Sequence, residues 1–201
     1  LRAQLLAQRI TRVDAVLYTH AHADHIAGLD ELRAINRIIG RPIPAYGTRD
    51  VIDELVTRFD YVFRPWTPPS FYRPVLTSHV IEAGGEAMIA GMNVHVFRQV
   101  HGHTLTLGLR VGPTAYCTNV AELDDPALDI LHGADTWVVG CFQRTTHVSH
   151  GWLERVFEWR ERIRPRRTVL THMGPDMDWA WMQRHLPAGV EAAYDGLTLR
   201  T

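Results

Sequence analysis

Hydrophobic and polar positions repeat along the chain with two different periods, which together predict a mixture of strands and helices. Short apolar runs rich in β-branched residues predict buried strands, and the first of these covers residues 13–18. Apolar residues spaced three and four apart predict amphipathic helices, the clearest over residues 152–163 before Pro165. The full pattern predicts strands over residues 13–18, 43–46, 87–90, 93–98, 105–111, 114–118, 136–140, 168–171 and 190–194, and helices over residues 26–38, 124–131, 152–163 and 177–185. A further helix is predicted after Thr48, which can cap it, with Val51, Leu55 and Phe59 on one face.

The order of these elements predicts an α/β fold. Glycine turns separate the strands between residues 87 and 118, as in antiparallel hairpins, whereas the later strands alternate with helices. Residues 64–74 contain four prolines and the aromatic residues Trp66, Phe71 and Tyr72, so we expect a long ordered loop there. No internal repeat, low-complexity tract or linker interrupts the sequence. We therefore expect a single domain of stacked sheets covered by helices over residues 1–201.

The composition is typical of a soluble globular protein and excludes several other classes. Of the 201 residues, 46% are hydrophobic and 21% are charged, which excludes a disordered or fibrous chain. Lys and Arg number 21 and Asp and Glu number 22, so the chain lacks the basic surplus of a nucleic-acid binder. The apolar runs are too short for a membrane span, and no targeting segment opens the chain, so we expect a cytoplasmic protein. Cys117 and Cys141 give no disulfide framework, and we assign them no role.

The 12 histidines are the unusual feature of the composition, because histidine is the commonest metal ligand. An HxHxDH segment, made of His20, His22, Asp24 and His25, follows the strand over residues 13–18. In an extended segment His20 and His22 point the same way and can bind one ion, and the remaining two residues follow at the junction with a helix. Three imidazoles and a carboxylate suit a divalent metal such as zinc. The alternative is a solvated histidine-rich loop. Such a loop would not explain why an aspartate lies among three histidines directly after a buried strand.

Six residues cannot complete two metal sites, so we expect further ligands at other strand ends. His101 follows the strand over residues 93–98, and His172 follows the strand over residues 168–171. Either histidine alone is typical of a structural role, but together with the HxHxDH segment both become expected ligands. His103 is the nearest alternative to His101, and we otherwise place it behind the ligands or against the substrate.

These residues resemble the metallo-β-lactamase superfamily, whose signature is the HxHxDH motif. The similarity runs from about Thr11 to Leu199, and the segments HGHTLTLGLR, LTHMG and LPAGVEAAYDG resemble the branch that contains phosphoribosyl 1,2-cyclic phosphate phosphodiesterase, an enzyme of bacterial phosphonate metabolism. The branch is also similar to ribonuclease Z. The resemblance implies an αββα sandwich. Because the family has an upstream region and this chain opens at Leu1 inside a helical pattern, we expect the domain to be N-terminally truncated and to lack its first strands.

The resemblance also implies the roles of individual residues. It implies that one divalent metal ion, zinc or manganese, is bound by His20, His22 and His101, and a second by Asp24, His25 and His172. It implies a catalytic role for Asp24 as well. His147 matches a histidine near the scissile phosphate, suited to donate to a phosphoryl or leaving oxygen. The alternative for His147 is a position at the start of a helix, before an N-cap at Ser149.

Several aspartates near these segments have ordinary explanations. Asp178 and Asp195 match the family pattern, but an acid in a first helical turn and a turn aspartate account for them equally well. Asp124 and Asp125 lie beyond a strand end and would have to fold back to reach a metal.

One departure from the family concerns Asn119, which stands where the family has a carboxylate that bridges both metals. An amide oxygen can bind a metal, so we keep Asn119 among the expected metal-binding residues, but it is neutral and bridges poorly. Losing one negative charge between two dications weakens the second metal in particular. Asn119 therefore marks either an inactivated member or a weakly metallated one.

The sequence as a whole predicts a metal-dependent phosphodiesterase that acts on a small cyclic phosphodiester, such as phosphoribosyl 1,2-cyclic phosphate. Two metals would bind phosphate oxygens and supply the attacking hydroxide, and His147 and His103 would contact the substrate. The alternatives are a tRNA 3′-processing-like nuclease, a lactone or thioester hydrolase, and a non-catalytic member of the superfamily. We expect no membrane and no nucleic-acid partner, and a homodimer is left open. We interpret the one arginine cluster, over residues 160–167, as a solvated helix end. An anion-binding patch is the second interpretation.

Overall fold

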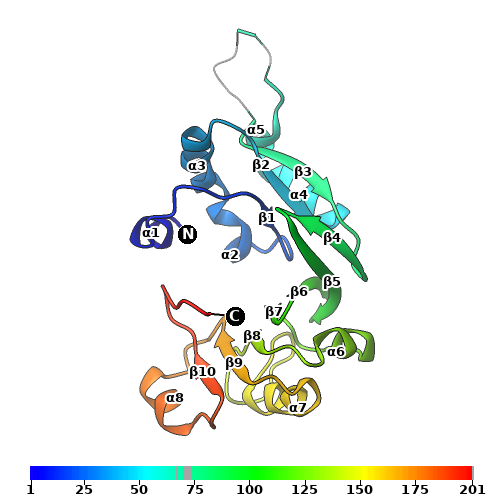
Figure 1. Ribbon diagram of the computed structural model, residues 1–201, viewed down its shortest axis with the longest axis vertical. Coiled ribbons are helices and arrows are strands. Elements are labelled where there is room, and N and C mark those ends of the chain that lie inside the picture. The colour runs from blue at the N-terminus through cyan, green and yellow to red at the C-terminus, as the bar shows by residue number, and fades with distance from the viewer. Residues whose placement is uncertain (67, 70–73, 201) are drawn as a thin grey trace. The chain divides into compact units, whose positions relative to one another are not determined.

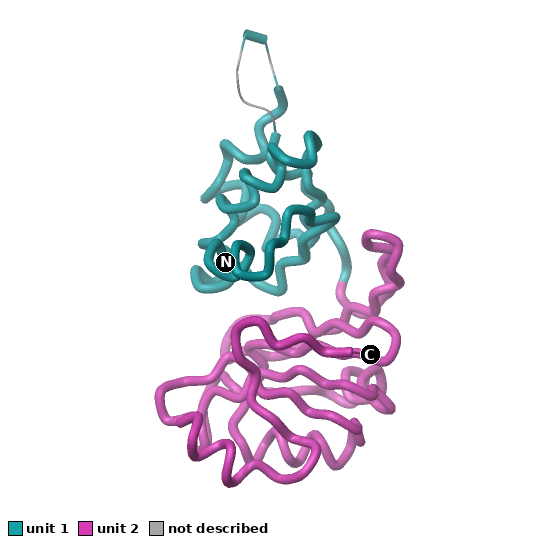
Figure 2. Tube along the Cα trace, turned by 60° about the vertical axis from the view of Figure 1, so that its left-hand side comes forward, with its two compact units in different colours: residues 1–82 teal, residues 83–201 magenta. Residues whose placement is uncertain are grey.

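The computed structural model describes residues 1–66, 68–69 and 74–200. The chain forms two compact units, residues 1–82 and residues 83–201, each with its own hydrophobic core (Figure 2). Both units combine strands with helices, which confirms the predicted α/β class. The loop predicted over residues 64–74 lies partly outside the described residues, and so do Phe71 and Tyr72.

The first unit is built on a three-stranded parallel sheet (Figure 1). Its strands are β1 (Val16–Leu17), β2 (Ile43–Gly47) and β3 (Leu76–Val80), and its helices are α1 (Arg2–Ala7), α2 (Ala23–Ile26), the 3₁₀ helix η1 (Ala27–Glu31), α3 (Leu32–Ile39), α4 (Arg49–Arg58) and α5 (Asp60–Phe63). Parallel neighbours need a crossover connection, which α2 to α3 provide between β1 and β2, and α4 and α5 provide between β2 and β3. Ile43, Ala45 and Leu55 are completely buried in the core between this sheet and the helices.

The first unit differs from the predicted elements in three places, and each has a physical reason. The strand predicted over residues 13–18 pairs with β2 only at Val16 and Leu17. The helix predicted over residues 26–38 opens as η1, where Gly28 disfavours an α-helix and lies against Leu1. The apolar pattern does not predict β3, because only Leu76 of its five residues is buried.

The second unit is built on a seven-stranded mixed sheet with the strand order β10-β9-β8-β7-β6-β5-β4. The strands are β4 (Gly85–Ile89), β5 (Met92–His101), β6 (Thr104–Val111), β7 (Thr114–Cys117), β8 (Thr136–Gly140), β9 (Arg167–Thr171) and β10 (Val190–Ala192), and the helices are α6 (Asp125–Leu131), α7 (Leu153–Ile163) and α8 (Trp179–His185). Strands β4 to β7 form an antiparallel meander, and β7 to β10 run parallel. The carboxyl ends of four neighbouring strands therefore lie at one edge of this sheet.

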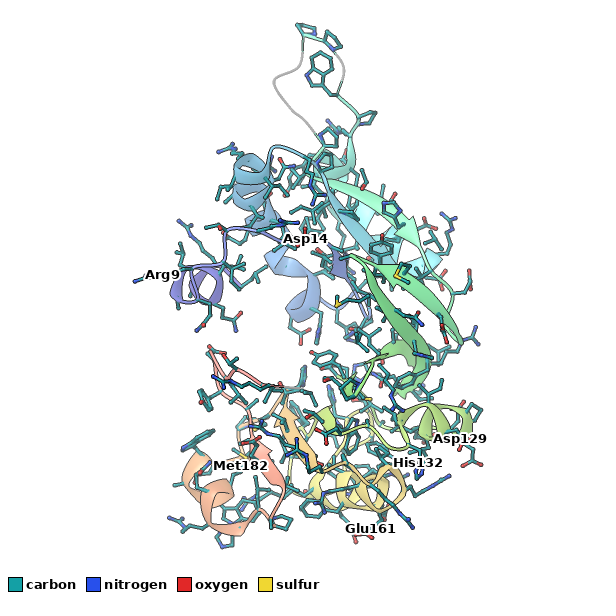
Figure 3. All side chains as sticks on the ribbon, viewed as in Figure 1. Arg9, Asp14, Asp129, His132, Glu161 and Met182 are labelled. Atoms are coloured by element: carbon teal, nitrogen blue, oxygen red, sulfur yellow. The ribbon has the colours of Figure 1, made fainter. Side chains whose placement is uncertain are left out.

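One core joins the three helices of the second unit to its sheet. Trp137 and Val139 of β8, Val156 of α7 and Leu131 of α6 are completely buried in it. Met182, on α8, is almost completely buried in the same core (Figure 3). The helices α6, α7 and α8 thus cover the sheet and fix the course of the parallel strands between them.

The helices are short, and aspartate side chains cap two of them. Asp124 accepts a hydrogen bond from the Ala127 N–H at 2.9 Å and caps α6, and Asp178 accepts one from the Trp181 N–H at 2.7 Å and caps α8. Thr48 occupies the N-cap of α4 as predicted, although its side chain makes no capping bond. Among the described residues no helix combines the length and the apolar composition that crossing a membrane requires.

We expect Gly108→Ala to destabilise the second unit. Gly108 on β6 is paired in register with Phe97 on β5, and a Cβ at this glycine would stand 2.2 Å from the buried Phe97 ring. Moving that ring lowers the free energy of unfolding by about 1–3 kcal/mol. Urea denaturation measures the loss, with Gly85→Ala as the control because a Cβ at Gly85 meets nothing within 4 Å. Equal midpoints for the two variants would contradict this packing.

Candidate active site

In the first unit the HxHxDH segment turns from the end of β1 into α2. His22 occupies the N-cap of α2 with an extended backbone, φ −67° and ψ 148°, and Asp24 and His25 lie within the helix. This confirms the predicted junction of loop and helix. The buried ring of His20 lies at the centre of the segment, with its centroid 4.6 Å from that of His22 and 4.3 Å from that of His25.

The electrostatics of this segment favour a bound cation. The His20 Nδ1 lies 3.1 Å from the Thr19 hydroxyl, and the Asp24 carboxylate lies 3.2 Å from Nε2 of His25. Three imidazolium charges at these ring separations would repel one another. Neutral rings that share their lone pairs with one or two metal ions avoid that repulsion, and a carboxylate adds the negative charge that such ions need.

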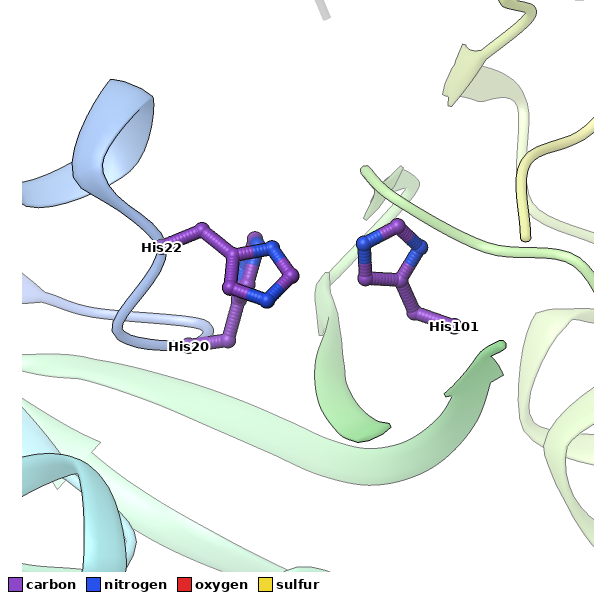
Figure 4. Close-up of side chains that lie close together, drawn as sticks. All are labelled: His20, His22 and His101. Atoms are coloured by element: carbon purple, nitrogen blue, oxygen red, sulfur yellow. The ribbon is translucent and has the colours of Figure 1, made fainter. Parts of the chain in front are cut away.

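In the second unit His101, the last residue of β5, is oriented by the backbone. Its Nδ1 lies 2.6 Å from the Ser149 carbonyl oxygen. Because a carbonyl oxygen only accepts, Nδ1–H is the donor, and the lone pair of the ring is left on Nε2. A carbonyl that fixes the tautomer and leaves the other nitrogen for the ion is the usual arrangement of a metal-binding histidine. Figure 4 shows His101 at the end of its strand in the second unit and, in the first unit, His20 and His22 on the loop before α2.

His172 follows β9 in a strained backbone conformation. Its φ is +52°, in the left-handed region that residues other than glycine seldom adopt. Such a conformation costs about 1–3 kcal/mol, and residues that keep it are concentrated at functional sites. The strain supports a functional role for His172, the second histidine that the sequence places after a buried strand.

The structure adds a histidine that the sequence analysis missed. The ring of His150 lies 4.5 Å from that of His101, 5.2 Å from that of His172 and 5.0 Å from that of His147. Within the second unit, His150 therefore bridges two of the predicted ligands. The sequence signal was the spacing HxxH in the loop after β8, where only the first histidine drew attention.

His147 contacts the ring of His150, and backbone N–H groups hold its own ring. Its Nδ1 accepts hydrogen bonds from the N–H groups of Ser149 and His150, each at 3.2 Å. These bonds place the ring proton on Nε2, so a neutral His147 presents a donor there. The helix α7 begins at Leu153 with Trp152 as its N-cap, so the alternative of an N-cap at Ser149 is wrong.

His103, the predicted substrate-binding residue, is exposed on the turn between β5 and β6. It lies two residues beyond His101. The structure places it at the same end of this hairpin as His101, at the surface.

Asn119 follows β7 and is fixed by a buried polar network. It is 2% exposed and adopts a φ of +50°. The Thr118 hydroxyl donates to its side-chain oxygen at 3.0 Å, and the Thr106 hydroxyl donates to its carbonyl at 3.2 Å. The Gln99 amide donates to the Thr118 carbonyl at 2.6 Å. A carboxylate of the same shape would accept the same hydroxyl, so the backbone at this position suits aspartate as well as asparagine.

The neighbouring acids have structural tasks. Asp124 caps α6, and Asp125 forms an ion pair with Arg162 at 2.7 Å, so neither folds back toward Asn119. Asp178, interpreted from the sequence as an acid in a first helical turn, is instead the N-cap of α8. Asp195 lies in a turn after β10, as its simpler explanation predicts.

Both cysteine thiols are buried. Burial raises the pKa of Cys117 to about 12, and it also raises that of Cys141 to about 12. The Trp137 indole N–H donates to the Cys117 sulfur at 3.4 Å. The thiols are therefore protonated at neutral pH. The sequence analysis assigns neither cysteine a role, and buried, protonated thiols are consistent with that assignment.

We expect His172→Gly to be more stable than His172→Ala when metal is removed. Both variants lose the imidazole, but only glycine adopts φ +52° without strain, so its free energy of unfolding should be higher by about 1 kcal/mol. Urea denaturation in the presence of a chelator measures the difference. At His103, where φ is not positive, the same pair of variants should show no advantage for glycine. A glycine variant no more stable than the alanine variant at position 172 would show that the strain is not real.

Comparison with known proteins places this arrangement in a family. The family model described as a β-lactamase superfamily domain matches residues 1–173. A curated relative from Porphyromonas gingivalis (strain ATCC BAA-308 / W83), named octanoyltransferase, is 30% identical over 200 residues. The match covers 98% of this chain but 39% of that protein, so the chain spans about two fifths of the length of the curated relative.

Solved structures extend the comparison to the fold. The crystal structure of a new diphosphatase from the PhnP family is 29% identical, with a TM-score of 0.89 over 100% of this chain and 76% of that chain. The short form of human tRNase Z shares the fold at 18% identity, with a TM-score of 0.64 over 98% of this chain and 83% of that chain. The chain belongs to the metallo-β-lactamase superfamily.

Proposed function

We propose that the protein is a dinuclear metal-dependent hydrolase that cleaves a small phosphodiester, and that a cyclic diester such as phosphoribosyl 1,2-cyclic phosphate is its substrate. One observation carries the proposal: within each unit, histidine rings gather beyond strand ends, around His20 in the first unit and around His150 in the second. We assign His20, His22 and His101 to the first ion, and Asp24, His25 and His172 to the second. These are the ligand sets that the family resemblance implies.

The chemistry of the donors fits the proposed ions. Imidazole nitrogens dominate both groups, and imidazole with carboxylate suits zinc or manganese. The Ser149 carbonyl leaves Nε2 of His101 as the nitrogen with the lone pair. When bound, two divalent ions supply positive charge to the phosphate oxygens and make water a better nucleophile.

The residues around the ligands position the substrate and its leaving oxygen. His150 contacts both His101 and His172, so we assign it the place next to the reacting phosphate. The Ser149 hydroxyl lies 3.0 Å from Nδ1 of His150, which leaves Nε2 as the nitrogen we assign to the substrate. The ring of His147 meets that of His150 edge to face and presents Nε2–H, a donor suited to a phosphoryl oxygen or the departing alkoxide. His103 stays a prediction as a further substrate contact.

A small substrate also fits the charge of the second unit. Three arginines of the cluster over residues 160–167 are paired with carboxylates: Arg162 with Asp125, Arg166 with Asp135, and Arg167 with Glu191. Paired arginines contribute little to binding a polynucleotide backbone, which needs several unneutralised cations. We accordingly propose that the protein has no nucleic-acid partner. We also propose that it has no membrane partner and that it is cytoplasmic.

A diphosphate is the second candidate substrate, because the structure with a TM-score of 0.89 is that of a diphosphatase. Hydrolysis of a P–O–P link needs the same neutralisation of phosphate oxygens as hydrolysis of a diester. The name of the curated relative, an octanoyltransferase, instead points to acyl chemistry. Lactone or thioester hydrolysis is therefore an outcome that the activity test must include.

We expect zinc- or manganese-supplemented protein to hydrolyse a cyclic phosphodiester, and His150→Ala to lower kcat by about 10²–10³ while leaving the metal content unchanged. His147→Ala should lower kcat less, because this residue is one ring further from the ligands. His132→Ala, a histidine at the end of α6, is the matched control and should keep full activity. Assays on phosphoribosyl 1,2-cyclic phosphate, on a nucleoside diphosphate and on a lactone or thioester separate the substrate classes. Turnover of the lactone or thioester alone would overturn the proposal.

A further inference from the structure

An exposed pair of aromatic side chains stands on the second unit without a structural task. Trp179 is 46% exposed and Tyr194 is 59% exposed, and their rings meet edge to face with centroids 6.1 Å apart. The neighbouring Trp181 packs against the core, whereas the ring of Trp179 faces solvent. Large aromatic rings left in water by a folded chain are typical of binding surfaces.

The register of the sheet places the strand that precedes Tyr194 beside the strand that precedes a predicted metal ligand. Strands β9 and β10 are parallel neighbours, with Leu170 opposite Ala192. His172 follows Leu170 by two residues, and Tyr194 follows Ala192 by two residues. The Ala193 N–H donates to the Leu170 carbonyl at 2.8 Å, so the two segments stay hydrogen-bonded one residue beyond the end of β10. Adjacent strands are about 4.8 Å apart, so the segments that carry Tyr194 and His172 leave the sheet from neighbouring strand ends.

The aromatic pair is also held in place by its backbone. Trp179 is the first residue of α8, whose N-cap is fixed by the bond from the Trp181 N–H to Asp178. The Tyr194 carbonyl accepts a hydrogen bond from the Leu197 N–H at 3.0 Å, which closes the turn after β10. A surface that is already ordered loses little conformational entropy when a planar group stacks on it.

We propose that Trp179 and Tyr194 form a stacking site for the nucleobase of the substrate, so that the substrate is a nucleotide-type phosphodiester or diphosphate. This inference rests on the proposed function, because it takes the phosphate to be bound at His172 and its neighbours. A base attached through a sugar to that phosphate reaches the adjacent strand end. Stacking on aromatic side chains tolerates any base, since every base has a π-face. The site therefore selects for the presence of a base more strongly than for its identity.

Steady-state kinetics of the metal-loaded protein test the proposal with two kinds of substrate. One kind carries a base, such as ADP-ribose or a cyclic nucleotide, and phosphoribosyl 1,2-cyclic phosphate carries none. Trp179→Ala and Tyr194→Ala should each raise KM for the base-bearing substrate by about tenfold, with kcat within about twofold, and leave the baseless substrate unaffected. Trp179→Phe and Tyr194→Phe should retain the wild-type KM. Tyr61→Ala, an exposed aromatic on α5, is the matched control.

Calorimetric binding of AMP and of ribose 5-phosphate separates the failure of this inference from the failure of the proposed function. AMP should bind at least about tenfold more tightly than ribose 5-phosphate, and Trp179→Ala should abolish that preference. This result supports the stacking site even if none of the phosphate substrates is turned over. Equal binding of the two ligands, or equal losses on both kinds of substrate in the alanine variants, would overturn the inference.

Discussion

The position at which each parallel strand ends is the constraint on which the rest of the site depends. Where a parallel strand is buried along its whole length, its own side chains are apolar. The side chains that bind ligands therefore lie beyond its carboxyl end. β1 ends before His20, β7 before Asn119, β8 before the loop that carries His150, and β9 before His172. His20, Asn119 and His172 thus each lie within three residues of a strand end, whereas His150 lies further along the loop that connects β8 to α7.

Backbone groups then decide how these side chains present their nitrogens. The Ser149 carbonyl holds Nδ1–H of His101, and the N–H groups of Ser149 and His150 hold Nδ1 of His147. Residues 147–150 therefore orient two histidines in opposite senses, one as a base that offers a lone pair and the other as a donor. The same segment brings His150 against His101 and His172, and this is why the proposed function assigns His150 a place beside the substrate.

Because of Asn119, the proposed metal site has less negative charge than it would have with an aspartate at this position. Asn119 keeps the left-handed backbone and the hydroxyl bond that an aspartate would keep, but it lacks the negative charge. Three of the remaining acids nearby are used as helix caps or in an ion pair, so none of these three offsets that loss. The proposed two-ion site would therefore hold its second ion less tightly than a site with a bridging carboxylate.

Local patterns predicted much of the fold, and long-range contacts account for what they missed. The strands from β5 to β9 were predicted within a few residues because their apolar runs are buried. The strand β3 was missed because its side chains after Leu76 are exposed or partly so. The HxHxDH segment is a local motif and was predicted in full. His150 was missed because its importance lies in contacts with His101 and His172, residues 49 and 22 positions away along the chain. Likewise, no local signal distinguishes the exposed Trp179 from the packed Trp181.

The most direct test of the two-metal account is to titrate the metal-free protein with zinc and with manganese and to count the ions bound per chain. The account predicts two sites, of which the second is weaker, and it predicts that Asn119→Asp tightens that second site by about tenfold or more because it restores one negative charge. A chain that binds no ion, or a second site that the aspartate leaves unchanged, would contradict the account.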